Sequence, residues 1–517
     1  MENKKLGKVD KFFGVTKAGS SIRTEIIAGI VTFLAMAYIL VVNPSAILSN
    51  SDRWSSPLMS TSSIFLATAL GAIVGTLLMA FLAKLPLAQA SGMGLNYSVG
   101  AILGGSLGFG VSYGNAMLLV LISGILFLLL SIISVKGISL RELIFDGIPE
   151  SVRGAISVGI GLFIAFIGMQ NAGIIVSTAF NVTAPDGTTI LTPDGSPILV
   201  PGTLVDLVAF NNYGLAPYVG AGAVVCLIGF FAIAILDHFK VKGSVIIGIL
   251  IATLAGIPLG VTSWSGESWA FWENFEAFFS MDPANGGAFF SAFTEGFNWG
   301  DGVQIMAIIM TIISFCMIDM FDTMGTCVGC CSAAGLVDAK GKPLNYNKIM
   351  YSDSIATCAG AFFGTSTVTT FVECGSGIAA GGRTGLTALS TAICFLLAIP
   401  LFPVIASIPG PAAAAALLYV GALMLKGIKN LKLDGMKNLI AAFLTIAMMP
   451  LSYSITDGIG FGLISYVVID IVCYLIDVIK YACSKKEGKE KPVWDLHAVT
   501  IIVTVLFLIY FFVPISF

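Results

Sequence analysis

Long apolar segments separated by short polar loops run along almost the whole chain. Segments of spanning or nearly spanning length are expected at about 24–48, 62–84, 87–104, 114–135, 151–172, 215–237, 243–263, 302–322, 350–364, 367–382, 385–407, 411–426, 437–452, 457–478 and 495–515. A straight helix needs roughly 20 apolar residues to cross a bilayer. Several segments are shorter than that, and two of the short ones are also rich in glycine. The pattern predicts an all-α polytopic membrane protein.

Lysine and arginine occur mainly in alternate loops, which indicates how the chain is oriented. The two longest loops expected outside, 173–214 and 264–301, contain neither residue type, although Arg53 lies in the first outside loop. The loops expected inside contain Lys84, Lys136, Arg141, Lys240, Lys242, Lys340, Lys342, Lys348, Lys426, Lys429, Lys432, Lys437 and the lysines of 480–491. Because basic loops stay in the cytoplasm, this distribution predicts fourteen spans and a cytoplasmic N-terminus (1–23). The segment 495–515 is then an extra C-terminal helix.

The fourteen expected spans divide into two sets of seven. Each set has a short, glycine-rich segment in third place, 87–104 in the first and 367–382 in the second. Since seven is odd, the second set enters the membrane from the opposite side, which gives an inverted repeat. Short, interrupted segments at matching positions of two repeats are typical of a binding site near the middle of the membrane.

Composition excludes several classes of function. Hydrophobic residues make up 57% of the chain and charged residues 11%, against about 25% charged in soluble domains. No basic stripe supports nucleic-acid binding. Cys327, Cys330 and Cys331 cluster, but the chain has two histidines, neither of them near in sequence, so we expect reduced cysteines and no metal site. No activated Ser, Cys or His arrangement indicates an enzyme, and no cofactor is expected.

The first motif with chemical content is LPLAQASGMGLNYSVG, residues 85–100. Pro86, Gly92 and Gly94 disfavour an unbroken helix, which leaves backbone N–H and C=O groups available. Asn96 follows with both a donor and an acceptor. We interpret this segment as lining a cavity, and the alternative is that its small residues serve close helix packing.

The second motif is TSTVTTFVECGSGIAAGGRTG, residues 365–385. The stretch 365–371 is β-branched and is predicted to be extended, and Glu373 then leads into a glycine-rich half-helix that contains Gly375. Glu373 and Arg383 lie in surroundings where charge is unfavourable unless it faces a polar cavity. The alternative is that Glu373 only caps its own half-helix.

The third motif is SFCMIDMFDTMGT, residues 314–326. Asp319 and Asp322 are three residues apart, so they share one helical face. A carboxylate in an apolar segment can hold a polar solute, and it can also gain and lose a proton. Proton coupling is therefore assigned to Glu373 and Asp319. The alternative is a structural pair that holds helices together.

Four strings in the chain resemble the azaguanine-type purine permeases of the nucleobase–cation symporter superfamily, which also contains xanthine and uracil carriers. These strings are VTFLAMAYILVVNPSAIL, GMGLN, FDTMGT and TSTVTTFVECGSGIAAGGRTG. The resemblance covers the chain from about residue 11 to the last segment. It implies a core domain (24–135 and 302–407) that holds the substrate and a gate domain (151–263 and 411–478) that moves relative to it.

The resemblance also implies a function and a set of site residues. It implies uptake of hypoxanthine, guanine or adenine across the plasma membrane, driven by protons in an elevator-like alternating-access cycle. Asn96, Asp319 and Glu373 would contact the base, with Gly94, Asp322 and the backbone at Gly375 in support. A homodimer is compatible with it. The alternative is an anion transporter, or a xanthine or uracil transporter, on the same fold.

Overall fold

A computed structural model gives the fold. It describes residues 7–48, 59–103, 111–135, 138–175, 179–181, 199–201, 218–262, 275–276, 278–280, 287–299, 305–338, 342–452, 454–483, 494 and 496–512. The chain divides into two compact units, which are described separately. The larger comprises Met1–Phe163, Gly266–Ala406 and Gly421–Phe517, and the smaller Ile164–Ser265 and Ser407–Val420.

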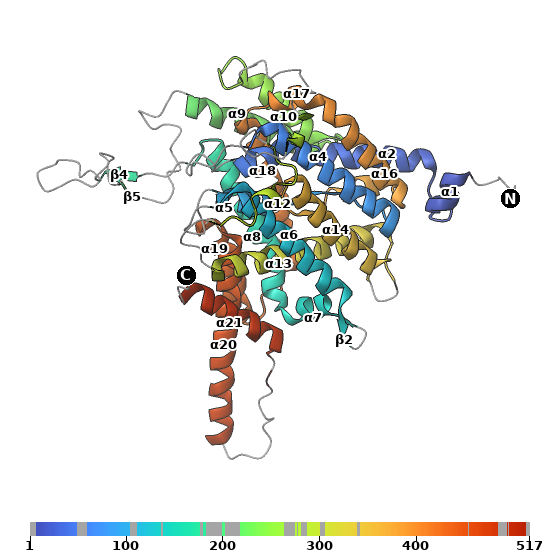
Figure 1. Cartoon of the computed structure of the whole chain (residues 1–517). Helices are drawn as coiled ribbons and strands as arrows, with labels where there is room; N and C mark the ends of the chain where they lie inside the picture. The colour runs from blue at the N-terminus through green and yellow to red at the C-terminus, as the bar shows by residue number, and fades with distance from the viewer. Residues whose placement is uncertain are drawn as a thin grey trace, which may run out of the picture. The chain divides into compact units, whose positions relative to one another are not determined.

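The helices and strands follow the apolar segments closely (Figure 1). The first part of the chain contains α1 (Lys8–Phe13), α2 (Ile22–Met36), α3 (Ile39–Leu48), α4 (Thr61–Leu78), β1 (Gln89–Ser91), α5 (Met93–Leu103), α6 (Tyr113–Ile132), β2 (Ser134–Val135), β3 (Ile138–Ser139), α7 (Leu140–Gly147), α8 (Glu150–Asn171), β4 (Ala179–Asn181), β5 (Leu199–Pro201), α9 (Tyr218–His238) and α10 (Ser244–Gly256). The rest contains α12 (Ser291–Thr294), α13 (Ile305–Ala334), α14 (Tyr346–Phe363), β6 (Val368–Thr370), α15 (Cys374–Ala379), α16 (Gly385–Ala398), α17 (Phe402–Ala406), α18 (Gly410–Met424), α19 (Met436–Leu451), α20 (Ile455–Cys483) and α21 (Ala498–Phe512).

Within the described residues, nine helices are long and apolar enough to cross a membrane. They are Ile22–Leu48, Thr61–Ala83, Tyr113–Ile132, Glu150–Asn171, Ala221–His238, Ile305–Ser332, Gly385–Ile405, Gly410–Lys429 and Ile455–Tyr481. Four further apolar helices are shorter: Met93–Leu103, Ser244–Gly256, Met436–Leu451 and Ala498–Ile509. The chain is thus a mostly helical, multi-pass membrane protein, and α21 lies where the extra C-terminal helix is expected. The arrangement as fourteen spans stays a prediction.

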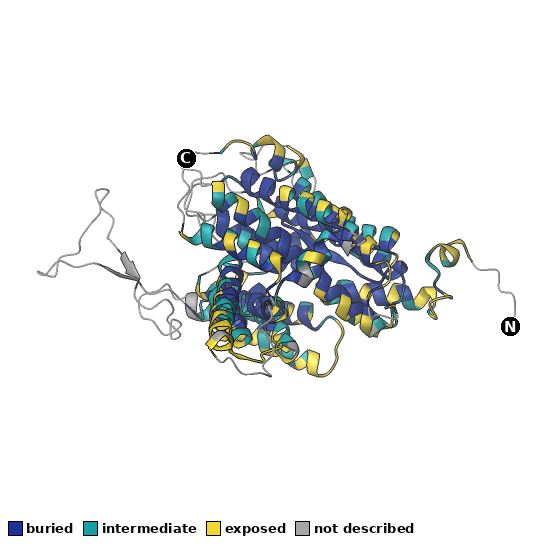
Figure 2. Cartoon of the chain, turned by 90° about the horizontal axis from the view of Figure 1, so that it is seen from below, coloured by how far each residue is buried: buried dark blue, intermediate teal, exposed yellow. Residues whose placement is uncertain are grey.

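Both units are packed through small residues. In the larger unit, α14 lies against α4 and α6, and α2 lies against α16. In the smaller unit, α9 packs on α10, and a Cβ added at Gly229 would lie 2.8 Å from the Cβ atoms of Ala252 and Ala415. Such close approach of backbones is how membrane helices gain van der Waals contact. Figure 2 shows buried residues on the inner faces of the helices, whereas α1 near the N-terminus is largely exposed.

A buried carboxylate from α2 caps the start of α16. Glu25 is fully buried, and it accepts hydrogen bonds from the backbone N–H groups of Arg383 and Thr384 at 3.0 and 3.1 Å. It also accepts from the hydroxyls of Thr384 and Thr387 at 2.9 and 2.6 Å. The first N–H groups of a helix have no intrahelical acceptor, so a carboxylate stabilises them.

Arg383, which the sequence places among the charges that could face a cavity, binds backbone carbonyls next to α15. Its guanidinium donates to the carbonyls of Ile378 and Gly382, both at 2.7 Å, at the end of α15. The C-terminal carbonyls of a helix also lack partners and attract cations.

Replacing Glu25 by Ala should destabilise the protein. Four donors lose their acceptor, at least two of them buried, and each unsatisfied group costs about 1–3 kcal/mol. We expect a clear fall in the melting temperature of the purified protein in detergent. The matched control is Glu150→Ala, because Glu150 pairs with Lys432 at the surface, where such pairs contribute up to about 1 kcal/mol. Equal melting temperatures for the two variants would contradict the capping role.

Candidate substrate-binding site

A two-stranded ribbon lies in the apolar interior of the larger unit. β1 and β6 pair antiparallel, with Gln89 opposite Thr370 and Ser91 opposite Val368. The pairing continues at both ends, where the Gly92 N–H donates to the Thr367 carbonyl at 2.8 Å and the Phe371 N–H to the Ala88 carbonyl at 3.2 Å. Each strand leads into a short helix, α5 or α15. The extended stretch predicted at 365–371 is therefore confirmed, and the helix break predicted in 85–100 contains the strand that pairs with it.

Threonine hydroxyls from the surrounding helices satisfy the outer edges of this ribbon. Thr76 of α4 donates to the Gln89 carbonyl and accepts from the Gln89 N–H, both at 3.0 Å. Thr357 of α14 accepts from the Val368 N–H at 3.2 Å. Backbone polar groups at membrane depth must find partners within the protein. These hydroxyls supply them.

Asp319 lies beside the ribbon on α13. Its side chain is 1% exposed, and one carboxylate oxygen accepts from the Thr357 hydroxyl at 2.7 Å. The other oxygen, Oδ1, has no hydrogen-bond partner among the described residues. An unsatisfied buried acceptor is costly, so this oxygen is suited to accept an N–H group from a bound solute or to carry a proton.

Glu373 is the N-cap residue of α15, and its carboxylate is hydrogen-bonded to Tyr38. The Tyr38 hydroxyl donates to Glu373 Oε1 at 2.7 Å. Tyr38 lies in the break between α2 and α3. Its ring is buried in the larger unit. Asp322, one helical turn from Asp319, interacts electrostatically with both Tyr38 and Glu373. Glu373 and Asp322 are partly accessible, unlike Asp319.

Asn96 is fully buried on α5 and links the two interrupted segments. Its amide oxygen accepts from the Ser366 hydroxyl, and its amide nitrogen donates to the Ser91 carbonyl at 3.5 Å. These bonds connect α5 to the ends of both strands. The structure therefore gives Asn96 a supporting role beside β1 and β6, and its contact with a substrate stays a prediction.

The two predicted site glycines differ in their surroundings. A Cβ added at Gly94 would meet Ile160 of α8 at 3.0 Å and Ile455 of α20 at 3.1 Å. The start of α5 is thus covered by apolar side chains from two other helices. At Gly375 nothing lies within 4 Å of an added Cβ, so the backbone beside Glu373 faces open space.

Sequence reasoning missed a fourth carboxylate of this site, Asp353 of α14. It is fully buried, and its Oδ1 accepts from Gln89 Nε2 at 2.5 Å and from the Thr323 hydroxyl at 2.7 Å. Its Oδ2 and the Gln89 amide oxygen have no partner among the described residues. The signal was present in YSDSIATC, where an aspartate enters an apolar segment. The same reasoning that selected Asp319 would have selected it.

Comparison with known proteins identifies the family. The model of the Permease family matches residues 23–193 and 197–461. The chain belongs to this family. It is 36% identical to a putative permease of Methanocaldococcus jannaschii over 463 residues, which are 90% of the chain and 92% of the relative. It is 35% identical to the adenine permease AdeP of Escherichia coli, with 90% and 91% covered.

A relative with a second purine specificity, and two solved structures, complete the comparison. The guanine/hypoxanthine permease PbuO of Bacillus subtilis is 33% identical over 97% of this chain and 100% of its own length. The membrane domain of the cyanobacterial bicarbonate transporter BicA superposes with a TM-score of 0.54 over 84% of the chain and 97% of that structure, at 14% identity. Murine Slc26a9 gives 0.51 over 92% and 73%, at 11% identity. The resemblance to purine permeases is confirmed, and the solved structures show a shared fold.

Replacing Tyr38 by Phe should weaken substrate binding without unfolding the chain. The change removes the hydroxyl that orients the Glu373 carboxylate, and a hydrogen bond to a charged group contributes about 1.5–3 kcal/mol. We expect the KM of transport to rise roughly tenfold or more. The matched control is Tyr113→Phe, whose hydroxyl donates to the Gly364 carbonyl at 2.5 Å. That change should lower the melting temperature and leave KM unaltered. Similar KM values for both variants would contradict the assignment.

Proposed function

We propose that this permease carries purine nucleobases, namely hypoxanthine, guanine or adenine, across the plasma membrane together with protons. The observation that carries the proposal is the gathering of Asp319, Asp322 and Glu373 around a strand pair in an apolar interior. Purine edges present several N–H groups, which carboxylate oxygens accept. Relatives that cover nearly the whole chain are adenine and guanine/hypoxanthine permeases.

The proposed cycle uses two domains. The core would comprise 24–135 and 302–407 and would hold the base, and the gate would comprise 151–263 and 411–478. In this scheme fourteen spans form the inverted repeat, with the basic N-terminus in the cytoplasm. The contacts of Ile160 and Ile455 with Gly94 support the scheme, because α8 and α20 belong to the proposed gate and α5 to the core. An elevator-like movement would open and close these contacts.

The proposed proton pathway follows from counting hydroxyl hydrogens. Thr323 donates its one hydrogen to Asp353, so in its 2.7 Å contact with Thr369 it must accept. Thr369 also interacts with the Asp319 carboxyl. With Asp319 protonated, its hydroxyl would donate to Thr369, Thr369 to Thr323, and Thr323 to Asp353. A proton leaving Asp319 would pass through Thr369 and Thr323 to Asp353, each hydroxyl receiving one hydrogen and giving one.

An anion transporter is the main alternative, because the solved structures that share the fold carry bicarbonate or other anions. Three carboxylates beside the candidate site disfavour an anionic substrate, since like charges at close range repel. A neutral base with N–H donors does not meet this barrier.

The proposal is tested by competition for uptake into cells that express the protein. Labelled hypoxanthine uptake should be inhibited strongly by unlabelled hypoxanthine, guanine or adenine. Uracil and bicarbonate should compete much less, because uracil lacks the imidazole N–H of a purine and the carboxylates repel bicarbonate. Cells with an empty vector set the background. Stronger competition by uracil would overturn the purine assignment, and inhibition by bicarbonate alone would favour the anion alternative.

Replacing Glu373 by Gln should separate binding from coupling. Glutamine keeps the shape and most hydrogen bonds of glutamate but cannot titrate. We expect base binding to persist while accumulation against a gradient is lost, with a flattened dependence of uptake on pH. Binding is measured on purified protein and accumulation in cells with and without a protonophore.

If Glu373→Gln still concentrates purine, and a protonophore abolishes this, then the proton is carried elsewhere. The hydroxyl path then becomes the candidate, and Thr323→Val breaks it without removing a carboxylate. Thr391→Val is a matched control, because the Thr391 hydroxyl donates to backbone carbonyls on another helix pair. Because Thr323 also accepts from the Thr370 N–H of β6, base binding is measured as well: loss of accumulation with binding retained, in Thr323→Val and not in Thr391→Val, would assign coupling to Asp319 and Asp353.

A further inference from the structure

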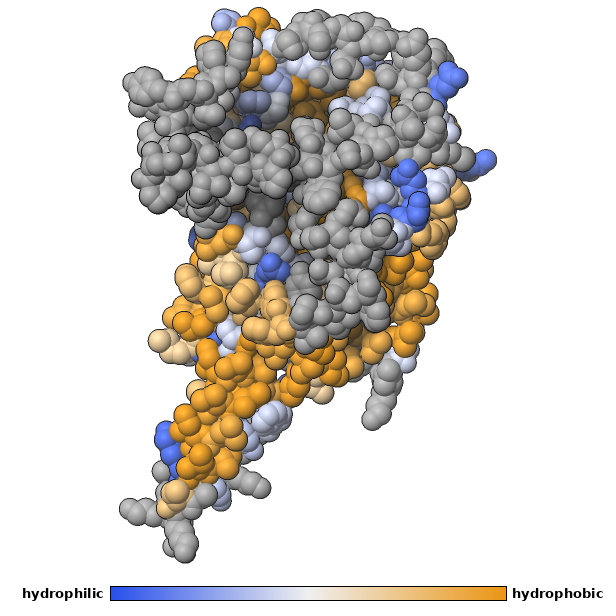
Figure 3. All heavy atoms as spheres, turned by 60° about the vertical axis from the view of Figure 1, so that its left-hand side comes forward, coloured by the Kyte–Doolittle hydropathy of each residue, from blue (hydrophilic) through white to orange (hydrophobic). Residues whose placement is uncertain are grey.

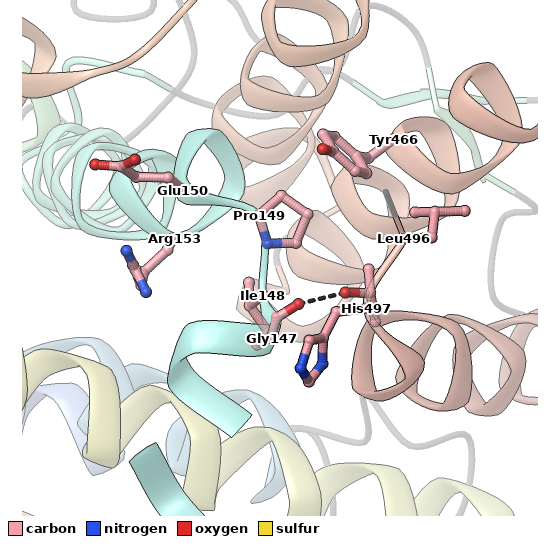
Figure 4. A pocket seen from close by; sticks show the side chains of 9 residues that line it. Gly147, Ile148, Pro149, Glu150, Arg153, Tyr466, Leu496 and His497 are labelled. Atoms are coloured by element: carbon pink, nitrogen blue, oxygen red, sulfur yellow. Dashed lines mark hydrogen bonds between the residues drawn. The ribbon is translucent and has the colours of Figure 1, made fainter. Parts of the chain in front are cut away.

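A polar pocket of about 250 Å³ lies in the larger unit, apart from the strand pair (Figure 4). It opens where the turn between α7 and α8 meets α20 and the beginning of α21. Its lining includes Pro149, Arg153, Tyr466, His497 and Thr500. The family match ends at residue 461, so the side of the pocket formed by Tyr466, His497 and Thr500 lies beyond it. None of these residues belongs to the candidate substrate-binding site.

The floor of the pocket is fixed by a hydrogen bond between its two sides. The buried Thr500 hydroxyl of α21 donates to the Gly147 carbonyl, as Figure 4 shows. A Cβ added at Gly147 would lie 2.8 Å from His497 Nδ1. This close approach requires glycine at position 147. The hydrogen bond and the close approach together join α21 directly to the turn that precedes α8.

Hydrogen-bond donors converge on the pocket from both sides. The Val499 N–H donates to His497 Nδ1 at 3.4 Å, so in the neutral ring Nε2 carries the hydrogen and is available as a donor. Tyr466 adds a hydroxyl. Glu150 begins α8, and the first N–H groups of that helix have no intrahelical acceptor. The N-terminus of this 22-residue helix also contributes partial positive charge.

The charges around the pocket favour an anion. The carboxylate of Glu150 pairs with Lys432 at 2.9 Å, and that of Asp470 pairs with Lys437 at 2.6 Å. Lys437 also lies 5.2 Å from the centre of the Tyr466 ring. Arg153 is a third cation, so the cations near the pocket (Lys432, Lys437 and Arg153) outnumber the two carboxylates by one. Arg153 already has an interaction within the chain, but a guanidinium with five donors can hold this interaction and a ligand oxygen together.

The two helices beside the pocket also expose apolar side chains, on faces other than those that carry Tyr466 and Thr500. Val468 and Val472 of α20 are 50% and 48% exposed, and Ile502 of α21 is 60% exposed. Figure 3 shows hydrophobic side chains covering the limb formed by α20. A polar anion site between helices that expose apolar side chains suits the two parts of a phospholipid, and basic pockets between helices on the cytoplasmic side bind such headgroups.

We propose that this pocket binds a phosphate ester, supplied by the headgroup of an anionic phospholipid. Arg153, His497 Nε2 and the Tyr466 hydroxyl donate to the phosphate oxygens, and the acyl chains lie along α20 and α21. A bound lipid thereby ties the C-terminal helix to the start of α8. The proposal does not depend on which solute the permease carries.

The test measures lipid retention by the full-length protein in a neutral detergent. Native mass spectrometry should detect bound phosphatidylglycerol on the wild type, and phosphatidylcholine should bind far less. In Arg153→Gln/His497→Gln, retained phosphatidylglycerol should fall about tenfold, because charge-assisted hydrogen bonds are the strong ones. Arg23→Gln is the matched control, since Arg23 is an exposed cation on α2 that does not line the pocket. It should retain lipid as the wild type does.

Two further arms make the result decisive. Inorganic phosphate and glycerol 3-phosphate are added as competitors. If either displaces phosphatidylglycerol at equal concentration, the lipid source is overturned and the site takes free phosphate. If the double variant elutes as an aggregate, Tyr466→Phe replaces it, with a loss of about threefold expected. Unchanged retention in the folded variants, or equal retention of phosphatidylcholine, would overturn the proposal.

Discussion

The pairing of β1 with β6 is the constraint on which the larger unit depends. Three residues from one part of the chain meet three residues some 280 positions later, inside an apolar core. A two-stranded ribbon leaves two edges of backbone N–H and C=O groups without partners. No lipid can satisfy them. The helices around the ribbon must therefore present hydroxyls at fixed positions, and this requirement determines where α4, α13 and α14 lie relative to the strands.

The same hydroxyl groups that bind the ribbon also bind the carboxylates, so these groups stabilise the fold and shape the candidate site. Thr357 binds both Val368 and Asp319, and Thr323 binds both Thr370 and Asp353. A threonine here has one hydrogen to give and two lone pairs to offer. Donating to a carboxylate uses the one hydrogen, and accepting from a backbone N–H uses one of the two lone pairs. A substitution at these threonines therefore affects the ribbon and the acidic groups at once, whereas the Tyr38 hydroxyl orients a carboxylate without bonding to the ribbon.

Local patterns predicted much of this arrangement, and long-range contacts account for what was missed. Glycine and proline in 85–100 and the β-branched run 365–371 indicated interrupted helices, because backbone preference is readable from adjacent residues. The approach of Gln89 to Asp353 joins residues 264 positions apart, which no local pattern reports. The carbonyl partners of Arg383 could not be predicted either, since they depend on where the chain turns after α15. The proposed domain division and the number of spans are untested by these contacts.

The acidic groups occupy two kinds of environment, and this difference separates their roles. Asp319 and Asp353 are enclosed, and each keeps one oxygen without a partner among the described residues. A buried oxygen of this kind gains from either a proton or a ligand N–H. Glu373 is partly accessible and already oriented by Tyr38, so it can meet a solute that arrives from open space beside Gly375. We therefore propose that Glu373 both meets the solute and exchanges a proton, whereas the enclosed pair is suited to hold a proton away from water.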